Sequence, residues 1–167
     1  MSLGMAKNLQ KYLSSQGEKP LLLWNRTLSK LKPVVDLGGK TVDTVDQLIQ
    51  SSDIIFSCVS KDDVVYSILG NAAKTNVKGK IFCEMSTVHP DTIEKLKNEL
   101  NAAGAEFICA PVFGAPAMAE AGKLVCLFAG DKEVVKKVQE YIVPAFAKKT
   151  IELGEDVTKA SYFKLIG

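Results

Sequence analysis

The sequence of 167 residues has few of the side chains that metal centres and disulfide frameworks need. It holds one histidine and four cysteines, and no two cysteines form a C-x-x-C pair. Zinc sites need grouped cysteine and histidine ligands, so the sequence predicts no metal site. Because each cysteine lies in an apolar run, we expect four reduced, buried thiols in a cytoplasmic protein.

Long apolar runs and an excess of one charge are also missing. The longest apolar stretch covers only a few residues, which is too short to cross a bilayer. The N-terminus lacks the charged and apolar regions of a signal peptide. A formal net charge of +2 is too small to favour nucleic acid or an anionic membrane. We therefore expect no nucleic acid and no membrane among the partners, and a small molecule as the ligand.

The composition that is present is typical of one globular domain. Apolar residues make up 47% of the chain and charged residues 24%, and both values are ordinary. Apolar strand-like runs alternate with amphipathic helical runs over the first two thirds of the chain. This alternation is typical of a mostly parallel sheet with helices on both faces, so the sequence predicts an α/β fold.

The expected elements follow from apolar periodicity and from turn residues. Expected helices cover residues 3–16, 27–37, 43–49, 60–70, 90–104, 131–146 and 157–167. Expected strands cover residues 21–24, 41–42, 53–59, 80–85, 106–109, 123–129 and 150–153. Thr27, Ser60 and Asp131 are predicted helix caps. Residues 110–119, which are small and include two prolines, are predicted to form a rigid loop.

Polar residues 86–92 follow one predicted strand and open the next predicted helix. Pro90 suits the first turn of a helix, where its missing N–H is not needed. Ser86 and Thr87 therefore lie at the carboxyl end of a strand and beside free helix N–H groups, where open α/β sheets bind ligands. The same hydroxyls also suit ordinary turns and caps, and this stretch alone favours that second interpretation. His89 is interpreted as a helix-start residue rather than a catalytic base.

A second candidate site follows the strand at 21–24, where Arg26 lies. In dinucleotide-binding folds an acidic residue at this place binds the ribose 2′-hydroxyl, whereas an arginine accommodates a 2′-phosphate. With Arg26 present and no carboxylate beside it, the sequence favours NADP over NAD. A solvated surface arginine is the alternative interpretation. Ser57, Val59 and Ser60 end the next strand, where a nucleotide would lie, although a capping role explains Ser60 equally well.

Four segments together resemble the β-hydroxyacid dehydrogenase family, which includes 3-hydroxyisobutyrate dehydrogenase, glyoxylate/succinic semialdehyde reductases and 6-phosphogluconate dehydrogenase. The segments are Met1–Leu9, Asn25–Thr27, Met85–Pro90 and Ala110–Gly114. In order, they are similar to the family's G-x-G-x-M-G-x-x-M-A-x-N-L, N-R-T, serine–threonine and A-P-V-S-G motifs. The resemblance covers essentially the whole chain as an N-terminal cofactor domain, and it implies a Rossmann-like fold.

The resemblance also implies roles for individual residues. The cofactor-binding residues would be Asn25, Arg26, Thr27, Ser57, Cys58, Val59 and Thr87, with NADP as the cofactor. The substrate-binding residues would be Ser86, Thr87, Phe113 and Gly114. Lys164 falls at the family's catalytic lysine, which exchanges a proton with the substrate oxygen and stabilises its charge during hydride transfer. Residue type alone gives Lys164 no special role, because it is one of 21 basic residues.

The sequence departs from the family at several positions. The first strand and the first two fingerprint glycines would precede residue 1, and Ser2 stands in the place of the third glycine. The turn that binds the cofactor phosphates is therefore incomplete. Phe113 replaces a substrate-binding serine, which puts the usual carboxylate contact in doubt, and Cys109 replaces a common aspartate.

These expectations combine into one function. Residues 1–155 would form an NADP-binding domain without its first strand, and residues 156–167 would begin an interdomain helix, with no C-terminal helical domain. The source protein would be an oxidoreductase that interconverts a small β-hydroxyacid or alcohol with its aldehyde or keto form, and this chain would be inactive alone. The alternative is a non-catalytic nucleotide-sensing or interaction module on the same fold. A rearranged sheet, a strand from another molecule or a homodimer would cover the edges left by the missing strand.

Overall fold

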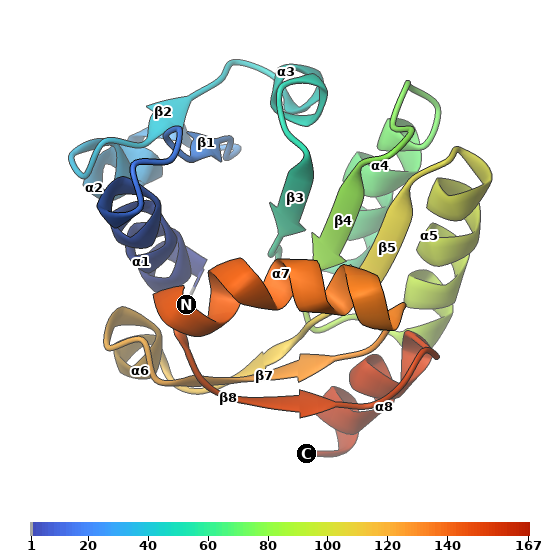
Figure 1. The fold of residues 1–167 in the computed structure, drawn as a ribbon. Helices are drawn as coiled ribbons and strands as arrows, with labels where there is room; N and C mark the ends of the chain where they lie inside the picture. The colour runs from blue at the N-terminus through green and yellow to red at the C-terminus, as the bar shows by residue number, and fades with distance from the viewer. Residues whose placement is uncertain (1) are drawn as a thin grey trace.

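The computed structural model describes residues 2–167 and has an α/β, Rossmann-like fold. Its strands form three small sheets (Figure 1). They are β1 (Leu22–Leu23) with β2 (Lys40–Thr41); β3 (Ile54–Ser57) with β4 (Ile81–Glu84) and β5 (Glu106–Cys109); and β6 (Val112–Phe113) with β7 (Leu124–Phe128) and β8 (Ala147–Glu152). Within the described residues, every strand pair is parallel except β6 with β7.

Helices alternate with the strands, as the sequence predicts. They are α1 (Ser2–Ser15), the 3-10 turn η1 (Leu28–Leu31), α2 (Lys32–Val35), α3 (Val45–Gln50), α4 (Asp62–Ala72), α5 (Pro90–Ala102), α6 (Pro116–Glu120), α7 (Lys132–Ala145) and α8 (Thr158–Ile166). In Figure 1, α4 and α5 lie behind the β3–β5 sheet, and α7 crosses in front of it.

The two faces of the β3–β5 sheet belong to two apolar clusters. Phe82 and Phe107 pack with residues of α4 and α5, whereas the neighbouring Cys83 and Ile108 pack with residues of α7. Successive side chains of a strand point to opposite faces, so a strand with a core on both sides is apolar along its whole length. All four residues of β4 are buried, which explains why this strand is predictable from its sequence.

Two predicted helix caps have different outcomes. Thr27 is the N-cap residue, as predicted, but it makes no side-chain cap hydrogen bond, and the segment after it begins as the 3-10 turn η1. Ser60 lies one residue too early, because Lys61 is the N-cap residue of α4. Two acidic residues fill the first turn of α4. They interact favourably with the helix dipole, so this helix starts without a side-chain cap.

Other predictions of local structure have mixed outcomes. Asp131 is confirmed as a cap, because its carboxylate accepts two backbone N–H groups from the first turn of α7. His89 is confirmed as a helix-start residue, since its ring Nδ1 accepts the backbone N–H of Asp91 at 3.2 Å. The loop predicted at 110–119 instead contains β6 and α6. Pairing with β7 makes β6 a strand, and such a long-range contact has no local signal.

A cavity of about 580 Å³ separates the β1–β2 sheet from the β3–β5 sheet. Within the described residues, β1 pairs with β2 alone and β3 pairs with β4 alone, so the facing edges are unpaired. Apolar residues of α1, α3 and α4 line the cavity, among them Met5, Ile49 and Leu69. Unpaired strand edges are what the sequence analysis expects here, although within residues 2–167 of the single chain no rearranged strand covers them.

Main-chain groups face this cavity from both sides. The carbonyls of Leu21 and Leu23 accept hydrogen bonds from β2 and the residue after it. Alternate residues of a parallel strand bond to the same neighbour, so the main-chain groups of Leu22 point the other way, towards the cavity. By the same alternation, those of Ile54 and Phe56 in β3 also face it. The free edges of two parallel strands, β1 and β3, therefore lie on opposite sides of the cavity.

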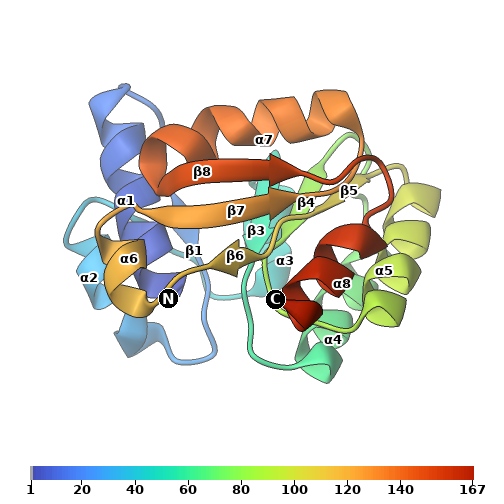
Figure 2. The ribbon, with the colours of Figure 1, turned by 90° about the horizontal axis from the view of Figure 1, so that it is seen from below.

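The third sheet and α8 complete the fold at the other end of the molecule. Figure 2 shows β6, β7 and β8 side by side, with α8 beside α5. Cys109 and Ala129 exchange two backbone hydrogen bonds, at 2.9 and 3.0 Å, which join the second sheet to the third. Helix α8 packs on α5 and β5, so it lies near the segment that follows β4.

Candidate functional site

A second cavity, of about 430 Å³, lies where β1 and β3 end; we call it the strand-end cleft. Its lining residues are Ser2, Trp24, Asn25, Arg26, Cys58, Val59, Ser60, Val64 and Ile68. Parallel strands end at the same edge of a sheet, and open α/β folds bind ligands at that edge. The structure therefore brings together cofactor candidates that the sequence analysis found on separate strands.

Arg26 is exposed and is, among residues 2–167, the only charged side chain that lines the cleft. Within residues 2–167 it forms no ion pair with a carboxylate. The side-chain amide of Asn25 donates to the Thr27 carbonyl at 3.1 Å, which holds the turn around Arg26. Thr27 itself does not line the cleft, and Ser57 lines the larger cavity instead. An unpaired guanidinium on a turn held in this way suits an anionic ligand.

Ser86 is buried, and its hydroxyl oxygen is already engaged. It is 3% exposed, and its Oγ accepts the backbone N–H of Val59 at 2.7 Å. Thr87, the next residue, is exposed. Ser86 therefore holds the segment after β3 against the segment after β4, while Thr87 is accessible to a ligand.

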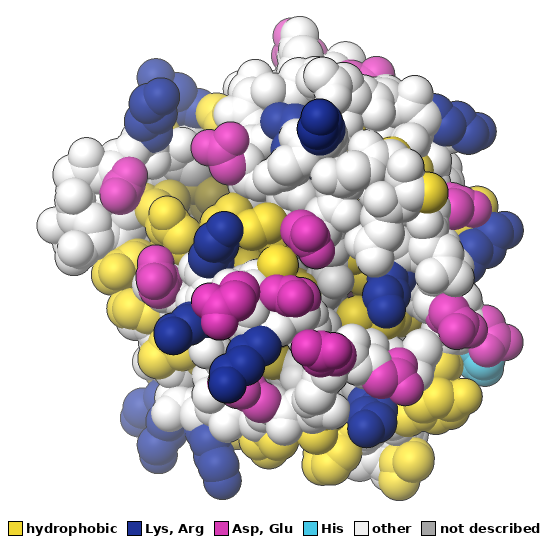
Figure 3. All heavy atoms as spheres, turned by 45° about the vertical axis from the view of Figure 1, so that its right-hand side comes forward, with side chains coloured by type: hydrophobic (Ala, Val, Ile, Leu, Met, Phe, Trp, Pro, Cys, Tyr) yellow, Lys and Arg dark blue, Asp and Glu magenta, His cyan; other side chains and the backbone are white. Residues whose placement is uncertain are grey.

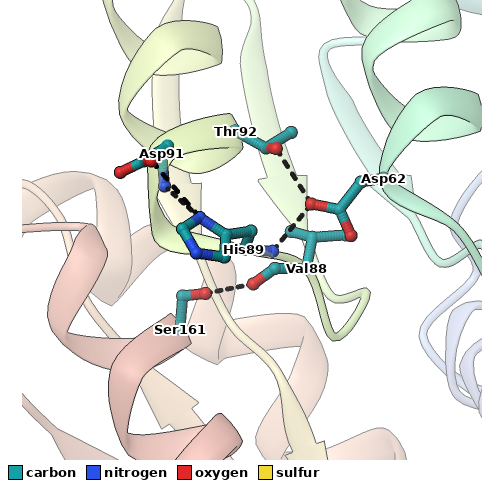
Figure 4. A network of polar contacts seen from close by, with 6 residues as sticks. All are labelled: Asp62, Val88, His89, Asp91, Thr92 and Ser161. Atoms are coloured by element: carbon teal, nitrogen blue, oxygen red, sulfur yellow. Dashed lines mark hydrogen bonds and ion pairs between the residues drawn. The ribbon is translucent and has the colours of Figure 1, made fainter.

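The carboxylate of Asp62 and the hydroxyl of Ser161 fix the segment around His89 (Figure 4). Asp62 Oδ2 accepts the backbone N–H of His89 at 2.8 Å and the hydroxyl of Thr92 at 2.9 Å. From α8, Ser161 Oγ donates a hydrogen bond to the carbonyl of Val88. The starts of α4 and α5 and the helix that carries Lys164 are thus joined to the segment after β4.

Lys164 and Phe113, both singled out by the sequence analysis, are in contact. The Lys164 ammonium lies 4.0 Å from the centroid of the Phe113 ring. Phe163 meets the same ring edge-on, with 6.4 Å between the ring centroids. A cation over an aromatic face is attracted by the ring quadrupole. The ammonium therefore contacts the ring of Phe113, at the position where the family that this chain resembles has a serine hydroxyl.

Gly114 has a structural reason to be glycine. Its φ of 144° is a backbone conformation that side chains disfavour. A Cβ at this position would lie 2.5 Å from Leu124 Cδ2. The turn after β6 therefore requires glycine whether or not a substrate binds there.

Glu84 is a buried carboxyl that the sequence analysis missed. It ends β4 with 0% exposure; its Oε1 accepts the Ser86 N–H at 2.7 Å, and its Oε2 has no hydrogen-bond partner. Burial raises the pKa of Glu84 to about 7, despite hydrogen bonds from Ser86 and Ser57 that lower it. The signal that could have found it is a lone carboxylate inside an apolar strand run, at residues 81–85.

The four cysteines are free thiols, and their environments do not activate them as nucleophiles. Burial raises the pKa of Cys58 to about 11 and that of Cys126 to about 12. Burial likewise raises the pKa values of Cys83 and Cys109. A reactive cysteine needs a lowered pKa, so these thiols contribute to packing.

The described residues contain no group of three or more side chains that could hold a metal ion. None of the described helices is long and apolar enough to cross a membrane. On the face drawn in Figure 3, acidic and basic side chains are interspersed rather than gathered into one field.

Curated relatives match this chain over nearly its whole length. An NADH-dependent oxidoreductase, ucdB, from Aspergillus ustus is 29% identical over 169 residues, covering 100% of this chain and 56% of the relative. Glyoxylate/succinic semialdehyde reductase 1 from Arabidopsis thaliana is 30% identical over 168 residues, covering 97% and 56%. Cytokine-like nuclear factor N-PAC from Drosophila pseudoobscura pseudoobscura is 31% identical over 159 residues, covering 92% and 26%. The chain thus spans little more than half of the two enzymes.

Solved structures share the fold. A 3-hydroxyisobutyrate dehydrogenase from Mycobacterium tuberculosis, solved with L-serine, has a TM-score of 0.87 at 17% identity and covers 99% of this chain and 55% of its own. A reductive aminase from Aspergillus terreus, in complex with NADPH and ethyl levulinate, has a TM-score of 0.82 at 25% identity and covers 98% and 56%.

The strand-end cleft and the matched fold agree with the family comparison. The model of the NAD binding domain of 6-phosphogluconate dehydrogenase matches residues 1–154. This range includes the whole lining of the cleft. The chain therefore belongs to the family of NAD-binding domains found in 6-phosphogluconate dehydrogenase.

Proposed function

We propose that this chain is the cofactor domain of an NADP-dependent oxidoreductase. The enzyme interconverts a small β-hydroxyacid or alcohol with its aldehyde or keto form by hydride transfer. The observation that carries the proposal is the exposed Arg26 in a cleft that no carboxylate lines. A guanidinium there favours the 2′-phosphate of NADP, whereas NAD is favoured by an acidic residue. The residues present therefore fit the adenosine end of NADP.

Each candidate residue has a place in this function. Asn25, Arg26 and Thr27 bind the 2′-phosphate end of the cofactor, which supplies the hydride when bound. The nicotinamide end is held by Ser57, Cys58, Val59 and Thr87, and the substrate by Thr87, Phe113 and Gly114. Ser86, which is buried and bonded to Val59, supports Thr87 from within the fold instead of meeting the substrate. Lys164 exchanges a proton with the substrate oxygen and stabilises the charge on it. The contact between Lys164 and Phe113 supports a shared substrate pocket.

The chain is organised in two parts in this proposal. Residues 1–155 are the cofactor domain, and residues 156–167 begin a helix that leads to a helical domain. Exposed apolar side chains of α8 support this: Tyr162, Phe163, Leu165 and Ile166. The protein is cytoplasmic and forms a homodimer; the four free thiols and the unpaired strand edges support these two statements, respectively.

Titration with the two cofactors tests the proposal. Trp24 is the only tryptophan and lines the cleft, so its fluorescence reports binding there. We expect about tenfold tighter binding of NADPH than of NADH. Arg26→Gln should remove this preference, since a hydrogen bond to a charged group contributes about 1.5–3 kcal/mol. Lys40→Gln, at an exposed lysine of β2 outside both cavities, is the matched control. Equal affinities, or tighter NADH binding, would overturn the assignment of NADP.

A second candidate function is a non-catalytic nucleotide-sensing or interaction module. Phe113 favours it, because the ring offers no hydroxyl to a substrate, and the similarity to a nuclear factor is consistent with it. The full-length protein distinguishes the two. NADPH oxidation with succinic semialdehyde or glyoxylate, lost in Lys164→Met, would support the enzyme. Nucleotide binding without any turnover would support the module.

A further inference from the structure

Glu84 is buried in a way that packing alone does not explain. No other carboxyl group in residues 2–167 is as fully buried, and its Oε2 has no partner. Burying a carboxyl group with an unpartnered oxygen is unfavourable, and an apolar residue would fill the same space without that penalty. The position of Glu84 at the end of β4, directly before Ser86, suggests what the carboxyl does instead.

Two short hydrogen bonds connect Glu84 to both strand-end segments. Its Oε1 accepts the Ser86 N–H at 2.7 Å, and Ser86 Oγ accepts the Val59 N–H at 2.7 Å. The first bond fixes the segment after β4, which includes Thr87. The second bond fixes the segment after β3, which lines the strand-end cleft. One carboxyl therefore holds two segments that the proposed function assigns to cofactor and substrate.

Several neighbouring elements supply the polar and titratable groups around Glu84. It lies opposite Ser57 of β3 and Cys109 of β5 in the parallel ladder. The other titratable groups that interact with it are the thiols of Cys58 and Cys83 and the carboxylate of Asp62. Burial raises the pKa values of the thiols of Cys58, Cys83 and Cys109, so all three are neutral near pH 7. Asp62 is exposed in part and binds His89 and Thr92.

Both protonation states of Glu84 are accessible near neutral pH. Burial raises its pKa to about 7, so a change of one pH unit there shifts the balance between the carboxylate and the neutral acid. A carboxylate accepts an N–H hydrogen bond more strongly than a neutral carboxyl group does. Protonation therefore weakens the bond to Ser86, and with it the support for Val59.

We propose that Glu84 is a positioning residue that couples the two strand-end segments and whose protonation loosens that coupling. The carboxylate form holds Ser86 and Val59 in the arrangement seen here. The neutral form relaxes both. What these segments bind rests on the proposed function, whereas the coupling itself does not, because it is a property of the ligand-free chain.

Nuclear magnetic resonance of the ligand-free chain from pH 5 to pH 9 tests the coupling. The backbone amide signals of Ser86 and Val59 should shift with one common midpoint near pH 7, the midpoint of the Glu84 side-chain carboxyl carbon. Glu84→Gln keeps an oxygen acceptor but cannot titrate, so both amide shifts should disappear. Ser86→Ala removes the bond to Val59 and the hydroxyl that lowers the pKa of Glu84, but it keeps the N–H of residue 86. The residue 86 amide should therefore still titrate, with a midpoint shifted upward together with that of Glu84, while the Val59 amide becomes insensitive. A purely structural role would not produce this pattern.

Glu106→Gln is the matched control, because it removes the same charge from an exposed position on the neighbouring β5. It should leave both amide midpoints unchanged. If Glu84→Gln fails to fold, the wild-type chain with labelled glutamate still compares the carboxyl midpoint with the two amide midpoints. Amides that do not follow the Glu84 midpoint, or that titrate unchanged in Glu84→Gln, would overturn the proposal.

Cofactor binding gives a second, separable result. NADPH should bind about threefold to tenfold more tightly at pH 8 than at pH 6, the range set by one hydrogen bond of about 0.5–1.5 kcal/mol. In Glu84→Gln the ratio of the NADPH affinities at pH 8 and pH 6 should fall to the value that the ionisation of NADPH alone causes. An unchanged ratio in the variant would contradict the effect on binding. If the chain binds no nucleotide at all, the proposed function fails, while the amide titration still decides the coupling.

Discussion

The ammonium of Lys164 lies over the face of the Phe113 ring, 4.0 Å from its centroid. The two residues belong to α8 and β6, so this contact joins the last helix to the third sheet at the residue that we propose for proton transfer. The ring is apolar and has no hydroxyl. The Phe113 ring therefore offers a neighbouring group no hydrogen bond beside Lys164.

A double-mutant cycle should measure this contact. Phe113→Leu and Lys164→Met each remove it while keeping much of the apolar volume. Urea unfolding of both single variants and the double variant should give a coupling free energy of about 0.5–1 kcal/mol, as for cation–aromatic pairs near the surface. Tyr66→Leu with Lys164→Met is the control cycle, and it should be additive, because the Tyr66 ring contacts Lys95, whereas Lys164 contacts Phe113. A coupling of zero in the first cycle would contradict the contact.

Glu84 should make stability depend on pH. Its pKa is about 7 in the folded chain against about 4.5 when exposed, so the folded state binds more protons between these values. The free energy of unfolding should therefore fall as the pH rises from 4.5 to 7, by up to about 3 kcal/mol from this group. The measurement is the difference between wild type and Glu84→Gln in urea unfolding across this range. A difference that stays constant with pH would show that Glu84 ionises normally.

Features that depend on one segment are the ones the sequence predicts well. The run at 81–85 is apolar apart from Glu84 and contains the buried strand β4, and the periodic apolar residues after Asp131 form α7. Short elements depend on distant partners instead. Phe113 is in a strand only because β7 lies beside it, and Thr27 starts the short 3-10 turn η1, where its side chain makes no cap hydrogen bond, instead of the long helix that the sequence predicts.

The candidate site shows the same division. Motif order alone singles out Arg26 and Lys164, because a linear pattern can carry their positions. The burial of Glu84 depends on three strands and the helices on both sides of the sheet. A carboxylate in an apolar run can therefore draw attention to this residue, but it does not predict the hydrogen bonds that the carboxyl makes. The bond from Ser86 to Val59 joins two separate strand ends and likewise has no local signature.

Ser161→Ala should destabilise the chain without changing its surface. The Ser161 hydroxyl is buried and donates to the Val88 carbonyl, so its removal leaves a buried acceptor with one bond fewer. We expect a loss of about 1–3 kcal/mol in urea unfolding. Ser67→Ala, at an exposed serine of α4, should change stability by less than about 0.5 kcal/mol. Equal effects of the two substitutions would argue against a bond between α8 and the segment after β4.

The unpaired edges of β1 and β3 should make the chain associate with itself. Unpaired parallel edges on both sides of an apolar cavity can accept an extended segment from a second molecule. Light scattering should then give the mass of two chains, and dilution should change the fluorescence of Trp24, which lines this cavity. Ile54→Lys places a charge on the cavity wall and should shift the equilibrium to monomers. Val35→Lys, at an exposed position of α2 outside the cavity, should leave association unchanged. A wild-type chain that stays monomeric at high concentration would mean that the open edges tolerate water.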